Sequence, residues 1–179
     1  MDRAFDAVAD ACLRLDLDDD EAVVATFVLV MAWGSGTSNS RSLRYTRSAL
    51  QNVTDAARTL RNAAEALRVV AETDSEGLAA AHRGFSLPGV QEAFFTKWFS
   101  FAGVKPERRW QPLILDSRVR RTLNETLDVW LNDLATQSNG PHRYIAYLTA
   151  LHAWAADLPE PMTPSRLEWI FYSHKGQPV

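Results

Sequence analysis

The sequence has little cysteine, little lysine and no long hydrophobic run, and each shortage limits what the protein can be. The single cysteine, Cys12, excludes an internal disulfide and fits a reducing compartment. No basic segment followed by an apolar core opens the chain, so we expect no secretory signal. The longest apolar run, 22–33, is interrupted by Thr26 and is too short to cross a bilayer. These shortages predict a cytoplasmic protein with no membrane partner.

Motifs for nucleotide and metal chemistry are missing as well. The chain contains neither a Walker A loop nor a GxGxxG fingerprint. Its four histidines are scattered, and none has metal-ligand spacing with Cys12. His152 lies among apolar residues, which is typical of a core or rim histidine. We therefore expect no metal site and no cofactor.

What the chain does have is helical periodicity along nearly all of its length. Its 179 residues, 46% of them apolar, suit one compact domain over 1–179, and the fold class we predict is all-α. Asp18 to Asp20 offer caps for a buried helix that ends near Trp33, and Pro164 suits a first helical turn. Strands are not predicted, although short extended segments could lie in 110–116. The predicted helices cover 3–15, about 20–33, 40–52, 53–73, 75–82, a segment around Lys97, 117–136, 142–158 and 164–173.

The distribution of charge is uneven, although the net charge is only −3. Residues 1–21 form an acidic segment with eight acids and two arginines, so the remainder carries a charge of +3. Arg41, Arg44 and Arg47 recur every three residues, which places them along one side of a helix. Such a row can bind the phosphates of a nucleic acid, whereas the plainer interpretation is a solvated helix face.

One lysine stands in an unusual setting, the stretch FFTKWFSFAG at 94–103. The chain has three lysines against sixteen arginines, and Lys97 lies among five aromatic residues. Loss of solvation should lower the pKa of its amine and make it a nucleophile. Alternatively, its stem packs on the rings while the ammonium reaches water.

Nineteen residues later, Asp116 follows the aliphatic run of LILDSRVRR. An aspartate at the start of a helix is commonly an N-cap, and capping holds the carboxylate rigidly without excluding chemistry. Lys97 and Asp116 are separated by a loop, 103–112, that contains two prolines.

The segment 94–123 resembles the lysine-bearing hairpin and following aspartate of the helix-hairpin-helix DNA glycosylases, especially their 8-oxoguanine branch. FTK would supply the lysine and ILD the aspartate. The likeness extends over most of 25–174 and is to the small bacterial members that lack the amino-terminal domain. Their segments occur here in the same order: MAWG with the arginine-rich helix after it, TKWFSFAG, LILDSRV, YIAYLTALHAWA and LEWIFYSH. Ala93 and Phe95 stand where the family hairpin has glycines, so the phosphate and cation contacts of those glycines are not carried over.

The resemblance implies a helical fold with a cleft between two lobes, and a DNA glycosylase that also acts as an abasic-site lyase. It implies Lys97 as the nucleophile and Asp116 as its electrostatic partner, on double-stranded DNA with a flipped base. The expected species is a monomer associated with the nucleoid. The same comparison suggests Asn39 for the gap left by the flipped base, with Ser38 and Ser40 as rivals. Further phosphate contacts are expected from Arg118, Arg120 and Arg121, and Trp33, Trp98 and Trp154 could line the base pocket, unless they pack in the core.

Two other functions are compatible with the sequence. One is a DNA-binding module of the same fold without catalysis, which the altered hairpin and the net acidity favour. The other is a helical protein-interaction domain that uses the acidic segment 1–21. The substrate base and the preferred opposite base are not encoded in any motif we can identify.

Overall fold

The computed structural model of the protein describes residues 3–35, 40–73 and 76–174. Within these ranges it is entirely helical, with ten α-helices, one π-helical turn and no strand. The elements are α1 (Arg3–Leu13), α2 (Asp20–Trp33), α3 (Ser40–Ala49), α4 (Val53–Val69), α5 (Glu76–Gly84), α6 (Glu92–Ala102), α7 (Ser117–Arg121), the π-turn η2 (Thr122–Thr126), α8 (Leu131–Leu134), α9 (Gly140–Asp157) and α10 (Pro164–His174). The all-α prediction is confirmed.

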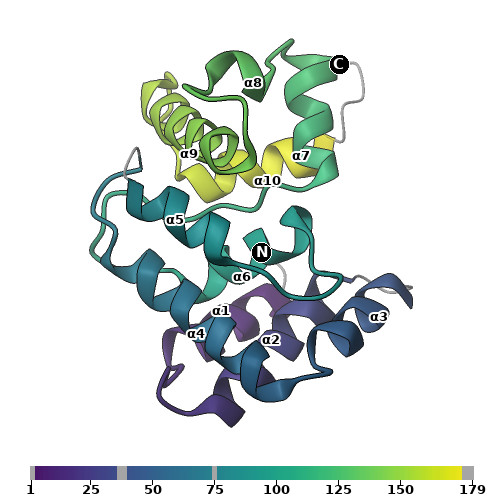
Figure 1. Ribbon diagram of the computed structural model, residues 1–179. Coiled ribbons are helices and arrows are strands. Elements are labelled where there is room, and N and C mark those ends of the chain that lie inside the picture. Colours follow the sequence, from purple (N-terminus) through teal and green to yellow (C-terminus); the bar gives the residue numbers. More distant parts are fainter. Residues whose placement is uncertain (1–2, 36–39, 74–75, 175–179) are drawn as a thin grey trace.

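The helices form two groups, which we call the first and the second lobe (Figure 1). In the first lobe, α2 packs on α1, α3, α4 and α6. In the second, α9 packs on α8 and α10, and α7 packs on α10. Helix α5 contacts both α4 and α9 and joins the lobes. One cluster of buried apolar side chains extends from Val8 to Phe171, so the two groups share a core.

Several helix boundaries follow from local chemistry that the sequence shows. Asp19 caps α2 by accepting hydrogen bonds from the backbone N–H groups of Glu21 and Ala22, both at 3.0 Å. Helix α2 is apolar on all sides, and Val23, Phe27 and Val30 have no exposed surface. Pro164 is the first residue of α10, where its missing N–H costs no hydrogen bond.

The predicted helix over 117–136 is wrong in its second half. After α7 the chain passes through η2, and Asp128 has a positive φ of 52°. The Val129 N–H donates to the Leu123 carbonyl oxygen at 2.8 Å, which closes the turn before α8 begins. The break is set by these backbone bonds rather than by a glycine or proline, so periodicity did not reveal it.

The connection between the lobes, residues 103–116, is held by side chains. The Arg108 guanidinium stacks over Trp110, 3.7 Å from the ring centroid. It donates hydrogen bonds to the carbonyl oxygens of Trp110 at 2.8 Å, Gly103 at 3.0 Å and Val70 at 3.1 Å, and also to that of Leu67. Arg108 therefore satisfies carbonyl groups at the ends of α4 and α6, which have no partners within their own helices.

Candidate active site

Lys97 lies in the middle of α6 and faces inward. Its exposed fraction is 7%. The side chain folds back along the helix, so that Nζ donates to the Ala93 carbonyl oxygen at 2.8 Å and lies 5.3 Å from the centroid of the Phe94 ring. The turn before α6 contains Gly89 with a φ of 77°, so the positive-φ glycine of this connection lies eight residues before the lysine.

Asp116 is the N-cap of α7 and is also buried, with 9% exposure. Its Oδ1 accepts hydrogen bonds from the backbone N–H groups of Arg118 at 2.9 Å and Val119 at 3.0 Å. The predicted cap is thus present. Because one oxygen is fixed by two donors, the carboxylate cannot swing freely toward Lys97.

A neighbouring hydrogen bond brings the two residues together. The backbone N–H of Leu115 donates to Thr96 Oγ1 at 3.1 Å, and Thr96 precedes Lys97 as Leu115 precedes Asp116. Thr96 itself donates to the Glu92 carbonyl oxygen at 2.7 Å. This bond joins α6 of the first lobe to the start of α7 in the second, and it accounts for the 19-residue spacing seen in the sequence.

Gly34 provides the space that the lysine occupies. A Cβ atom on Gly34 would lie 2.6 Å from Cδ and 2.8 Å from Cε of Lys97. The φ of Gly34 is −66°, which any residue can adopt, so the requirement is for space alone. The glycine of the MAWG motif therefore leaves room for the Lys97 side chain.

The surroundings of Lys97 lower the pKa of its amine. Burial is the largest influence on Lys97 and lowers its pKa. The charge of Asp116 raises this pKa, as does that of Glu168 when it is ionised, and the charge of Arg118 lowers it. The net pKa lies below the usual value of 10.5. Glu168 is a carboxylic acid from α10 that the sequence analysis missed. The sequence indicates its burial only weakly, through its position between the inward-facing residues Leu167 and Phe171.

The predicted arginines have different surroundings. Arg44 and Arg47 are exposed on α3, which also contains Arg41, and Asn39 lies outside the described residues. Arg118 is exposed and stacks over Tyr172, 4.7 Å from the ring centroid. Arg121 is exposed and pairs with Glu125 at 3.6 Å.

Arg120 is half-buried and paired with an acid instead. It forms an ion pair with Glu92, whose other oxygen lies 3.0 Å from His82 Nε2. Burial alone would raise the pKa of Glu92, but the hydrogen bonds and charges of His82 and Arg120 outweigh it and leave the pKa lowered. This cluster ties α5, α6 and α7 together, so Arg120 has a structural partner.

The three predicted pocket tryptophans do not share one environment. Trp98 has no exposed surface, and its indole N–H donates to the Leu60 carbonyl oxygen at 3.0 Å, so it belongs to the core. Trp33 is half-buried and packs edge-on against Phe5 and Phe101. Trp154 is half-buried on α9. Aromatic rings that do adjoin the candidate site are those of Phe94 and Tyr172.

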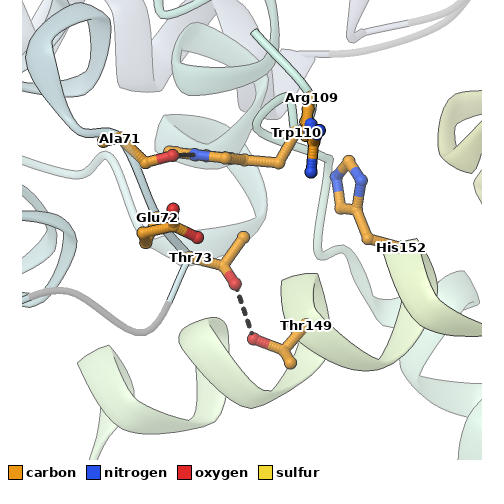
Figure 2. A pocket seen from close by; sticks show the side chains of 7 residues that line it. All are labelled: Ala71, Glu72, Thr73, Arg109, Trp110, Thr149 and His152. Atoms are coloured by element: carbon orange, nitrogen blue, oxygen red, sulfur yellow. Dashed lines mark hydrogen bonds between the residues drawn. The ribbon is translucent and has the colours of Figure 1, made fainter.

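An open cavity of about 310 Å³ lies at the junction of the lobes, lined by residues after α4, in the connecting segment and on α9 (Figure 2). It is crossed by a hydrogen bond of 2.9 Å between Thr73 Oγ1 and Thr149 Oγ1, one from each lobe. Trp110 forms part of its wall and donates through Nε1 to the Ala71 carbonyl oxygen at 2.7 Å. Neither Lys97 nor Asp116 lines this cavity, so the cavity and the lysine–aspartate site are distinct features.

Membrane-spanning helices and metal sites are both absent from the part of the chain that the structure describes. No helix there has the length and apolar character needed to cross a membrane. No group of three or more histidine, cysteine, aspartate or glutamate side chains is arranged there to hold a metal ion.

Comparison with known proteins gives one match. Residues 4–172 match the family model described as "Putative 8-oxoguanine DNA glycosylase OGG-like protein". No curated protein and no solved structure matches the chain. The match covers nearly the whole sequence, including α6, the extended connection and α7, and agrees with the all-helical fold. The chain therefore belongs to the OGG-like family.

Proposed function

We propose that the protein excises a damaged or modified base, such as 8-oxoguanine, from double-stranded DNA and acts through a Schiff base on Lys97. The observation that carries this proposal is a buried amine of lowered pKa beside a carboxylate fixed by two backbone donors. The hydrogen bond between their chain neighbours Thr96 and Leu115 joins the two lobes, and the chain belongs to the OGG-like family. An enzyme that acts on a base must first take it out of the helical stack.

The first step is attack by the unprotonated amine of Lys97. Nζ forms a bond to C1′ of the sugar, the bond from C1′ to the base breaks, and the electron pair leaves with the base, which takes up a proton. Burial favours this step because it disfavours the ammonium form, which has no lone pair. The low exposure of Lys97 also limits competition from water.

The role of Asp116 is electrostatic. Positive charge develops on the sugar as the base leaves, and a fixed carboxylate stabilises it without moving. The nitrogen then gives up one of its two protons, and O4′ takes up a proton as the bond from C1′ to O4′ breaks. The nitrogen keeps its other proton, so the product is the protonated imine. Removal of a C2′ proton and loss of the 3′-phosphate complete β-elimination and cut the strand.

Contact with DNA is proposed for the face that carries α3 and the turn before α6. The Arg44 guanidinium lies 5.3 Å from the Tyr45 ring centroid, and that ring is edge-on to Phe94, beside the Lys97 amine. Gly89 approaches the same tyrosine closely. Arg44 and Arg47 would bind phosphates on this face, and Arg118 and Arg121 would do so near Asp116. Arg41 remains a sequence-based prediction. Asn39 remains a prediction for the vacated base position.

Borohydride trapping tests the proposal. The protein is mixed with duplexes that carry 8-oxoguanine, other lesions or an abasic site, and a covalent adduct is sought by mass. We expect an adduct on a base-bearing lesion that disappears in Lys97→Gln and persists in Lys105→Gln, since Lys105 is an exposed lysine of the connecting loop. Adducts on the abasic site alone would leave the excised base unnamed.

The competing function is a DNA-binding module without catalysis. If the folded protein forms no adduct on any duplex but binds DNA in a salt-dependent way, that function replaces the one proposed. If it does not bind DNA at all, both fail, and the protein-interaction domain is left.

A further inference from the structure

Glu168 is a third ionisable group at the lysine–aspartate site, and the reaction outlined above does not use it. It lies on the inward face of α10 with 9% exposure. The ionisable groups that interact with its charge are Lys97 on α6, Asp116 before α7, and Tyr144 and Tyr147 on α9. A buried carboxyl in such a place needs a physical explanation.

The direct contact of Glu168 is with the chain segment that leads to Asp116. Oε2 accepts a hydrogen bond from the backbone N–H of Ile114 at 2.9 Å. The carbonyl oxygens of Leu113 and Ile114 accept from the hydroxyl groups of Tyr144 at 2.9 Å and Tyr147 at 2.8 Å.

With the Thr96 bond to Leu115, side chains of three helices therefore hold the backbone of 113–115. Among the described residues this extended segment has no partner strand, so these side chains take the place of a sheet in satisfying its buried polar groups. Glu168 and Tyr147 both bind Ile114, two residues before Asp116, and Glu168 is the one that accepts its N–H.

The charge state of Glu168 matters to Lys97. A second carboxylate near the amine would stabilise the ammonium form, which cannot attack. Burial raises the pKa of Glu168 to about 8, with Asp116 acting in the same direction, while the Ile114 N–H and Lys97 act against it. Near neutral pH the carboxyl is then mainly uncharged, and it still offers an oxygen to the Ile114 N–H.

We propose that Glu168 is a positioning residue that works in its neutral form: it anchors Ile114 and thereby Asp116, while leaving Lys97 to face one carboxylate charge instead of two. The inference rests on the proposed function. It assigns Glu168 no contact with substrate and no step of proton transfer to or from the DNA.

Glutamine and leucine substitutions separate the two parts of this role. Glu168→Gln keeps an uncharged acceptor for the Ile114 N–H, and we expect its single-turnover excision rate at pH 7 to stay within about threefold of wild type. Glu168→Leu removes the acceptor, and misplacement of Asp116 should slow excision by about 100-fold. Glu160→Gln, an exposed glutamate outside α10, is the matched control. If Glu168→Gln is as inactive as Lys97→Gln, the charged form is required and the proposal is overturned, as it is if Glu168→Leu is fully active.

Carbon-13 NMR supplies a readout that does not depend on activity. The Glu168 carboxyl carbon is identified by its loss in Glu168→Gln and should titrate near pH 8, whereas a midpoint near 4.5 would overturn the proposal. Lysine Cε signals are simple to assign in a chain with three lysines, and the Lys97 signal should show no rise of its pKa in Glu168→Gln. If wild type forms no adduct on any duplex, the proposed function fails and the catalytic role with it, while the carboxyl titration still reports the proton on Glu168.

Discussion

Replacing Glu168 by glutamine should make the protein more stable at alkaline pH, an unusual result for a change at a buried hydrogen-bonded residue. The reason is the difference between the pKa of this carboxyl in the folded chain, about 8, and its ordinary value of 4.5. Between these values the folded state keeps the proton and the unfolded state does not. The free energy of unfolding must therefore fall as pH rises through this window.

The size of the effect follows from the width of the window. Each pH unit between 4.5 and about 8 costs about 1.4 kcal/mol, so the whole window is worth about 5 kcal/mol. That is comparable to the entire stability of many small domains, about 5–15 kcal/mol, so it should be easy to measure. Below pH 4.5 both states carry the proton, and above about pH 8 neither does, so the dependence levels off at both ends.

The assay is urea unfolding of wild type, Glu168→Gln and Glu160→Gln from about pH 5 to about pH 9. The difference between wild type and Glu168→Gln isolates this one carboxyl, because the other groups that titrate are common to both proteins. We expect wild type to lose stability relative to Glu168→Gln over the window, and Glu160→Gln to follow wild type. Parallel curves for wild type and Glu168→Gln would refute the reasoning, since they would mean that Glu168 titrates alike in the folded and unfolded chains.

Three other substitutions test the remaining contacts. Gly34→Ala should slow single-turnover excision by about 100-fold because the new methyl group displaces the proposed nucleophile, while the urea midpoint stays unchanged. Full activity would show that the Lys97 side chain can move aside without loss of function. Arg108→Ala should lower the free energy of unfolding by about 3 kcal/mol because carbonyl groups at two helix ends lose their donor. Arg109→Ala, at an exposed neighbour, should have little effect, and equal losses would contradict this role of Arg108. Arg44→Ala should reduce the slope of log affinity for duplex DNA against log salt concentration by about 1. Arg14→Ala, in the acidic segment, should leave the slope unchanged. The opposite pattern would show that α3 does not contact DNA.

The local features of this fold could be predicted because they are encoded by neighbouring residues. The Asp19 cap of α2 and the Asp116 cap of α7 each involve donors within three residues, and the helix that carries Lys97 is visible in its apolar pattern. The helix break after η2 could not be predicted in this way. It depends on the positive φ of Asp128 and on backbone bonds that no turn residue announces.

The sequence by itself also determined the two residues proposed for chemistry, through their spacing and their place in family motifs. Only the tertiary structure decided what surrounds them. It assigned Trp98 to the core, paired Arg120 with Glu92, and brought Glu168 from α10 to the segment before Asp116, across 54 positions of the chain. The physical reason is that a side chain's protonation and freedom depend on desolvation and on partners supplied by distant helices, which a linear pattern does not contain.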